Sequence, residues 1–177
     1  TAANLVGVAV GLALYARLGE DDRRLRRPVA VLYLVLVSAV SGAFAASIGA
    51  GAANIVFGRD LMTGFGFWFT TELVNDIIIL PVVLTSPPVT VWWAHLRRLP
   101  VILARYPARL APAAALAASI AVSLVVGGPG AIGFAVPVLL WCALTYSLFP
   151  AVVLTLGYSA LMLVAAAGGV FWLPGAT

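Results

Sequence analysis

A strongly apolar segment in the middle of the chain, residues 68–81, reads W-F-T-T-E-L-V-N-D-I-I-I-L-P. It nevertheless contains three polar side chains, Glu72, Asn75 and Asp76. Their i, i+3 and i+4 spacing places them on one face of a helix, with Trp68 one turn before Glu72. An ionisable group inside a membrane span costs about 2.5–3.5 kcal/mol by insertion scales, so it usually faces the interior of a helix bundle. This helix face is therefore a candidate site.

The composition indicates that the chain lies in a membrane. Hydrophobic residues make up 63% of it and charged residues only 9%, whereas typical soluble domains are about 45–50% apolar and about 25% charged. Apolar runs of about 20 residues recur, where a β-barrel would have alternating segments of about 10 residues. We therefore expect an all-α, polytopic transmembrane helix bundle with the lipid bilayer as its main partner.

The placement of the charges predicts the orientation. All ten basic residues are Arg, and nine of them fall within residues 17–27 and 97–109. Such clusters mark cytoplasmic loops, so we place both blocks inside the cell. The net charge of +4 is compatible with nucleic acid, but a nucleic-acid groove needs basic, polar and aromatic residues interleaved across one surface. That arrangement is absent from the sequence, and we expect no nucleic-acid partner.

The apolar runs predict about six spans, with both ends of the chain outside. They cover residues 2–16, 29–57, 61–85, 110–126, 131–149 and 150–168. Residues 89–109 combine tryptophans with arginines and predict a cytoplasmic amphipathic connector on the membrane surface. The first run is short of the membrane thickness. We therefore expect residues 1–177 to be a single integral-membrane domain that is an excised or truncated piece of a longer protein.

Small residues predict where the helices pack closely. Gly7 and Gly11 form a G-x-x-x-G motif, which either allows two backbones to approach or is ordinary glycine of a membrane helix. A second stripe repeats every fourth residue along the second span, at Ser38, Gly42, Ala46 and Ala50. In the third span, Pro81 removes a backbone donor and predicts a kink.

Several kinds of chemistry are excluded by the residues present. One histidine, His95, and one cysteine, Cys142, with scattered acidic residues cannot supply a closed zinc site. The loop at residues 127–130 lacks the strand and the lysine of a phosphate-binding loop. Glu72 and Asp76 would suit acid–base chemistry, but nothing else supplies a substrate site. We expect no catalytic residue, no cofactor and no metal in this chain.

The polar face at Glu72, Asn75 and Asp76 has three interpretations. The first is a structural cluster that hydrogen-bonds to neighbouring helices. The second is a site that responds to a ligand or a proton. The third is a transport pathway, for which polar residues on several spans or matching broken helices would be expected.

The same segment resembles the signature of the membrane-associated sensor domain, the first type of the MASE family, roughly W-W-L-G-D-x-L-G-x-L-x-x-x-P. Trp68, Phe69, Glu72 and Pro81 match its two aromatic positions, its acidic position and its proline at the same spacing. Asn75 replaces a family glycine, and the charge of Asp76 stands where the family has an apolar residue. A second match covers residues 137–144, P-V-L-L-W-C-A-L, which is similar to the family's P-L-L-L-W-A-A-L.

The resemblance implies that this chain is part of an input module, which has about eight or nine spans in members of the family. Such a module is joined to a cytoplasmic output in cis: a diguanylate cyclase, a cyclic-di-GMP phosphodiesterase or a histidine kinase of a two-component system. It implies no catalytic residue in this chain. The candidate sensing cluster then consists of Trp68, Glu72, Asn75, Asp76 and Pro81.

Our hypothesis is a sensory domain in the bacterial inner membrane that regulates an output absent from this chain. The alternative is a small-solute transporter or its substrate-binding subunit. A third interpretation is a scaffold that only anchors and dimerises an effector. A homodimeric partner and a small-molecule ligand are both compatible with the hypothesis, and the sequence names neither the ligand nor the output.

Overall fold

The computed structural model describes residues 2–91, 97 and 105–170. All the regular elements within these residues are helices, which confirms the all-α expectation. The chain forms two compact units, an N-terminal unit of Thr1–Thr85 and a C-terminal unit of Ser86–Thr177. Each unit is described below by itself.

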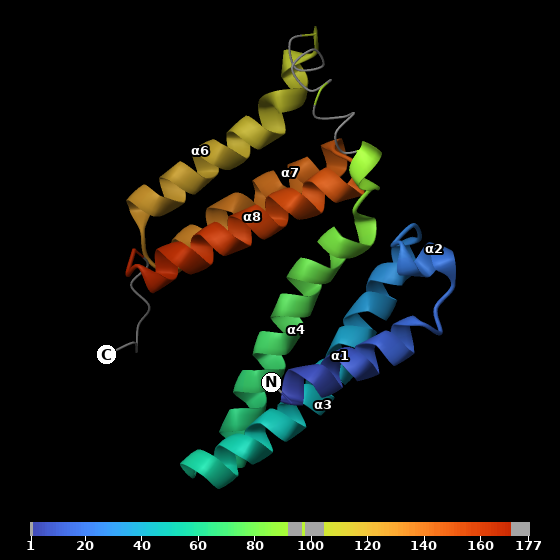
Figure 1. Ribbon diagram of the computed structural model, residues 1–177. Coiled ribbons are helices and arrows are strands. Elements are labelled where there is room, and N and C mark those ends of the chain that lie inside the picture. The colour runs from blue at the N-terminus through green and yellow to red at the C-terminus, as the bar shows by residue number, and fades with distance from the viewer. Residues whose placement is uncertain (1, 92–96, 98–104, 171–177) are drawn as a thin grey trace. The chain divides into compact units, whose positions relative to one another are not determined.

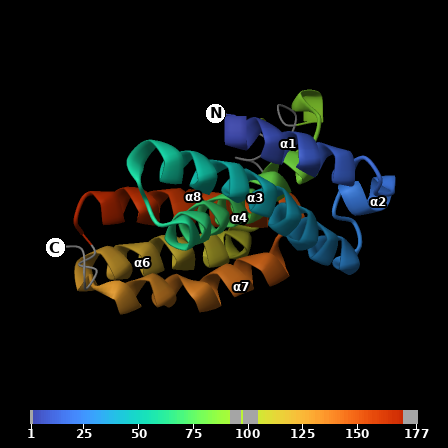
Figure 2. The ribbon, with the colours of Figure 1, turned by 90° about the horizontal axis from the view of Figure 1, so that it is seen from below.

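The N-terminal unit is organised around one long helix. Its elements are α1 (Ala2–Tyr15), α2 (Glu20–Arg23), α3 (Pro28–Phe57) and α4 (Leu61–Thr85). Both α1 and α4 pack against α3 (Figure 1, Figure 2). Pro28 begins α3, where its fixed φ suits the first helical turn. Gly58 ends α3 in the left-handed conformation, and its N–H donates to the Asn54 carbonyl at 2.9 Å.

Small residues bring α1 and α4 close to α3. A methyl group added at Gly7 would lie 3.1 Å from the Ala45 Cβ, and one added at Gly49 would lie 2.7 Å from the Trp68 ring. The predicted close-packing motif on α1 is therefore confirmed. All four residues of the predicted stripe on α3 are buried: Ser38, Gly42, Ala46 and Ala50. Close backbone approach at these small residues therefore contributes to holding the three helices together, beside a small core around Leu34 against which Tyr15 of α1 and Leu80 of α4 pack.

The first arginine-rich segment is folded. The Tyr15 hydroxyl donates to the Arg23 carbonyl at 2.8 Å, and Arg23 Nε donates to the Leu18 carbonyl at 2.8 Å. Leu25 has a φ of 52° and is buried in a small core with Ala30. A non-glycine residue in the left-handed region is strained, so its burial compensates the backbone cost. The turn therefore ties the end of α1 to the start of α3.

The C-terminal unit consists of shorter helical pieces. They are η1 (Pro107–Leu110), α6 (Ala111–Val126), η2 (Pro129–Ala135), α7 (Val136–Thr145) and α8 (Leu148–Ala167). Here η marks 3₁₀ helix. The unit is built on a buried cluster in which larger side chains meet small ones. Its members are Leu116, Ala131, Ala135, Cys142, Tyr158, Met162 and Ala165.

Hydroxyl groups in the C-terminal unit are directed at backbone atoms. The Tyr158 hydroxyl donates to the Ile132 carbonyl at 2.6 Å. The Tyr146 hydroxyl donates to the Arg109 carbonyl at 2.7 Å and accepts from the Ala113 N–H at 3.2 Å. These bonds satisfy backbone groups at helix ends and in the 3₁₀ segment, where the helical ladder leaves them unpaired.

Four helical segments are long and apolar enough to cross a membrane: Pro28–Phe57, Leu61–Thr85, Pro107–Val126 and Leu148–Ala167. The predicted count of six is not confirmed. Helix α1 has 14 residues, which spans about 21 Å against a hydrocarbon thickness of about 30 Å.

The expected fifth span, residues 131–149, is divided. Its first part is the 3₁₀ segment η2, and α7 ends at Thr145 because Tyr146 adopts an extended backbone. Pro150, expected to open the sixth span, lies inside the first turn of α8. The predicted connector at residues 89–109 lies largely outside the described residues.

Candidate functional site

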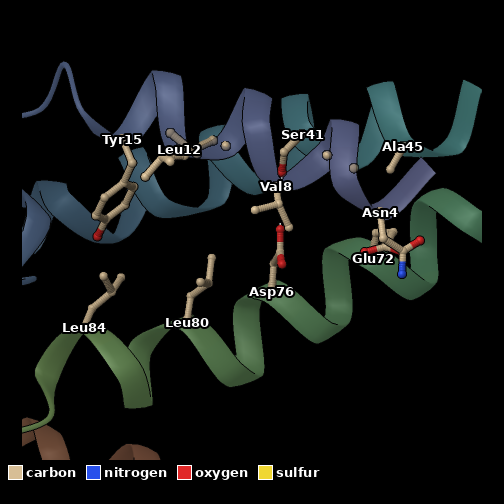
Figure 3. A pocket seen from close by; sticks show the side chains of 14 residues that line it. Asn4, Val8, Leu12, Tyr15, Ser41, Ala45, Glu72, Asp76, Leu80 and Leu84 are labelled. Carbon is tan, nitrogen blue, oxygen red and sulfur yellow. Dashed lines mark hydrogen bonds between the residues drawn. The ribbon is translucent and has the colours of Figure 1, made fainter. Parts of the chain in front are cut away.

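Helices α1, α3 and α4 enclose a groove of about 380 Å³ in the N-terminal unit (Figure 3). Pockets for small molecules typically measure about 300–1,000 Å³. The lining side chains come from all three helices: Asn4, Gly7, Val8, Gly11, Leu12, Tyr15, Val37, Ser41, Gly42, Ala45, Glu72, Asp76, Leu80 and Leu84. The glycines matter here, because a side chain at either of the two on α1 would fill the space between helices.

The groove has a polar end and an apolar end. On α4 its wall consists of Glu72, Asp76, Leu80 and Leu84, four residues that recur every helical turn. Figure 3 shows Asn4 of α1 at the end of the groove where Glu72 lies. Tyr15 and Leu12, at the other end of α1, lie toward Leu80 and Leu84. The groove is therefore amphipathic along its length.

Asp76 is the polar link between α3 and α4. The Ser41 hydroxyl donates to Asp76 Oδ2 at 3.3 Å, and the same hydroxyl lies 3.2 Å from the Ser38 carbonyl oxygen. One proton therefore serves two acceptors at long distances, which makes a weak bond. The fully buried Ser38 hydroxyl faces the same carboxyl, but it has no partner that meets hydrogen-bond geometry among the described residues.

Glu72 carries the second carboxylate of the groove. Its Cβ lies 3.5 Å from the position that a Cβ on Gly42 would occupy, so the missing side chain of Gly42 admits it. Within the described part of the chain, Glu72 forms no hydrogen bond and no ion pair. No arginine or histidine is among the described residues that line the groove. Among the residues that the structure describes, the two carboxylates therefore have no cationic partner in the groove.

The structure brings together only part of the predicted cluster. Glu72 and Asp76 line the same groove, whereas Asn75 is exposed and does not line it. Trp68 packs its ring on Gly49 of α3. Helix α4 continues through Pro81, whose carbonyl accepts the Thr85 hydroxyl at 2.6 Å. Trp68 and Pro81 therefore support the helix that carries the carboxylates, and neither lines the groove.

Sequence reasoning missed the groove residues of the other two helices. Asn4, Tyr15 and Ser41 are distant in sequence from the acidic segment, and nothing in their own spacing connects them to it. The two glycines of α1 did carry a signal, because their spacing predicts a close approach to another helix. That approach places the first and second spans beside each other. It did not show which side chains flank the contact.

No metal centre is indicated by the described residues. Within residues 2–91, 97 and 105–170, no group of three or more His, Cys, Asp or Glu side chains is placed to hold a metal ion. The chemistry available in the groove is therefore that of two carboxylates, an amide, hydroxyl groups and apolar walls.

Comparison with known proteins finds two similar sequences, and both are described as the same kind of protein. The chain is 28% identical over 144 residues to a probable diguanylate cyclase, DgcF, of Escherichia coli O157:H7; the match covers 81% of this chain and 28% of that protein. It is 33% identical over 81 residues to the probable diguanylate cyclase DgcF of Escherichia coli strain K12, covering 45% of this chain and 22% of that protein. The matches thus span about a quarter of the length of these relatives.

No protein-family model matches the chain. No solved structure matches it either.

Proposed function

We propose that this chain is a membrane-embedded input domain of a bacterial signalling protein. It would regulate a cytoplasmic output domain in cis, with a diguanylate cyclase as the first choice of output. A cyclic-di-GMP phosphodiesterase or a histidine kinase would be coupled in the same way. The proposal places the chain in the inner membrane as a multi-pass protein.

The observation that carries the proposal is the extent of the similarity. It covers 81% of this chain but 28% of a relative described as a probable diguanylate cyclase. The regular elements of the described residues are all helices, and these residues give no sign of a catalytic domain. A region of this kind in a cyclase-linked protein is best explained as the part that receives the stimulus.

The finer assignment rests on the sequence. The resemblance at residues 68–81 and 137–144 supports the first type of the MASE family, and the two arginine blocks support cytoplasmic loops on either side of the α3–α4 pair. Six crossings with both ends outside remain our proposed topology, in which α1 and the η2–α7 segment complete the count.

The groove supports a mechanism for input. A stimulus that occupies the groove, or that changes the charge of Glu72 and Asp76, would alter the spacing between α1 and α4 on α3. A stimulus can shift an equilibrium only if it interacts differently with two conformations of the bundle. In this proposal Trp68, Asn75 and Pro81 belong to the helix that moves, and Glu72 and Asp76 belong to the site that detects.

The test uses the full-length protein in cells, with cyclic-di-GMP as the readout. The double variant Glu72→Gln, Asp76→Asn keeps side-chain shape and removes both charges, and we expect at least a threefold change in cyclic-di-GMP under some growth condition. The matched control is Asp60→Asn, a charge removed outside the groove. Membrane fractionation verifies that each variant inserts equally.

Two results would overturn the proposal. Unchanged output of the double variant under all conditions would remove the groove as the input site. Solute uptake by vesicles that contain only residues 1–177 would favour the transporter instead.

A further inference from the structure

We propose that the groove binds a small primary amine in its ammonium form, with a single apolar tail that lies along α1 and α4. This inference names a class of ligand for the groove that serves as the input site in the proposed function. It rests on the proposed function only in the claim that binding changes the output. Binding itself is a property of the groove and is measured separately.

The charges of the groove select a cation. Glu72 and Asp76 lie one helical turn apart, and no basic side chain is among the described lining residues. An unpaired charge in a low-dielectric environment is costly unless a partner neutralises it. An ammonium group supplies a positive charge and three donors. Its three N–H groups could donate to the two carboxylates and the Asn4 amide oxygen at the polar end of the groove.

The apolar end selects the rest of the molecule. Beyond Asp76 the α4 wall continues with Leu80 and Leu84, and Leu12 and Tyr15 of α1 lie on the facing wall. The distance along α4 from Asp76 to Leu84 is about 12 Å at a rise of about 1.5 Å per residue. A linear chain of about eight carbons has this length, and the groove volume of about 380 Å³ limits the occupant to a small molecule.

Other occupants fit less well. An anion would face two carboxylates with no basic side chain among the described lining residues, and a neutral apolar molecule would leave Glu72 without a partner and Asp76 with only the Ser41 hydroxyl. The same ammonium chemistry occurs in lipid headgroups such as phosphatidylethanolamine. However, Glu72 and Asp76 lie near the middle of α4, one of the four candidate spans, whereas headgroups lie at the ends of a span. We therefore commit to a free amine.

The experiment measures binding of octylamine to the full-length protein in phosphatidylcholine nanodiscs at neutral pH, by titration calorimetry against empty nanodiscs. We expect saturable binding at one site. The double variant Glu72→Gln, Asp76→Asn should weaken it at least tenfold. Val8→Trp should also weaken it at least tenfold by filling the groove, and because Val8 is 67% exposed the larger ring adds little folding strain. The matched controls Asp60→Asn and Asn75→Ala should bind as the unmodified protein does.

Octanoate and octan-1-ol serve as probes of the charge requirement, because they share the tail and differ in the head. The proposal is overturned by absence of saturable octylamine binding to the unmodified protein, by equal binding to the charge-removed variant, or by octanoate binding as tightly as octylamine. The same titration is repeated with the protein in nanodiscs that contain phosphatidylethanolamine. If this lipid competes with octylamine in a saturable way, the site belongs to a lipid headgroup and the proposal of a free amine is overturned.

Cyclic-di-GMP output separates this proposal from the proposed function. If octylamine does not bind but the charge-removed variant still alters output, the ligand class is wrong and the input role stands. If octylamine binds and output never changes, the ligand class stands and the input role fails.

Discussion

The two units of this chain are both apolar helical assemblies, but they differ in how much their helix contacts depend on small residues. In the N-terminal unit, glycines, alanines and serines on α3 let α1 and α4 approach its backbone. In the C-terminal unit, Leu116, Tyr158 and Met162 fill a core together with small residues. The first arrangement leaves a groove with two carboxylates, whereas helices α6, α7 and α8 contain no charged residue.

This difference suits the two units to different tasks. Close backbone contacts are sensitive to small displacements, because each glycine that admits a neighbour fixes the distance between two helices. A core of interdigitating side chains, with hydroxyls bonded to backbone carbonyls, is better suited to remain in one arrangement. We therefore expect signals to be detected in the N-terminal unit and the C-terminal unit to act as a support.

The largest expected effect tests the bulky core of the C-terminal unit. Leu116 is 3% exposed, and Leu116→Ala would leave a cavity. We expect the free energy of unfolding to fall by about 2 kcal/mol, the low end of the range for such substitutions. The low end applies because lipid is as apolar as leucine, so that only the lost packing contacts destabilise the variant. The measurement is denaturant unfolding in micelles. Leu144→Ala, at a site 79% exposed, is the matched control; equal losses would show that the core does not depend on bulk.

The next effect tests the close contact in the N-terminal unit. A Cβ at Gly49 would lie 2.7 Å from the rigid Trp68 ring, so Gly49→Ala should lower the free energy of unfolding by about 1–2 kcal/mol, the lower part of the range for overpacking. Gly51→Ala on the same helix and Gly157→Ala on α8 meet nothing within 4 Å. Both controls should be neutral or slightly stabilising, since alanine is the better helix former. Thermal unfolding of all three variants decides the point, and a neutral Gly49→Ala would contradict the backbone-contact account.

A smaller effect tests the hydroxyl bonds of the C-terminal unit. Tyr158→Phe removes the 2.6 Å bond to the Ile132 carbonyl and leaves that carbonyl unpaired. We expect the free energy of unfolding to fall by about 0.6–1 kcal/mol, the usual net contribution of such a hydrogen bond. Tyr33→Phe, on a residue 38% exposed, provides the control. Identical unfolding of the two variants would mean that this hydroxyl does not stabilise the unit.

The smallest effect concerns the turn between α3 and α4. Asp60 Oδ2 accepts the Thr63 N–H at 2.7 Å, and this bond holds the pKa of the Asp60 carboxyl below its ordinary value. A lowered pKa means that the stabilisation is present above the unfolded-state pKa and is lost as pH falls through the folded-state pKa. Melting curves of the unmodified protein and Asp60→Asn should differ slightly at neutral pH and converge in acid. A difference that grows in acid would contradict the assignment.

The sequence predicts the class of fold well and the site only in part. Apolar runs of membrane length dictate helices, and the small residues of α3 and the Gly7–Gly11 motif mark the contact between α1 and α3, because these are local patterns with a period that can be counted. The all-α class and these packing motifs are confirmed. The role of Glu72 and Asp76 remains a prediction.

What the sequence misses depends on relations between helices. Helical spacing places Asn75 beside Glu72 and Asp76, but the rotation of α4 on α3 leaves Asn75 exposed. The contribution of Asn4 and Ser41 depends on which helices become neighbours. The count of six spans relied on hydropathy alone and is not confirmed, because hydropathy does not reveal that the fifth run begins as the 3₁₀ segment η2 and leaves α7 with 10 residues.

The bond between Ser41 and Asp76 also has a consequence for biosynthesis. Helix α4 carries two carboxylates and is less apolar than α3, so it is the costlier of the two to transfer from the translocation channel into lipid. Helix α3 precedes it by only three residues, 58–60, and presents Ser41 and Gly42 to it. We therefore expect the two helices to leave the channel together as a hairpin. A ribosome that pauses after α3 would then delay the membrane entry of α3 itself, because α3 would wait for α4.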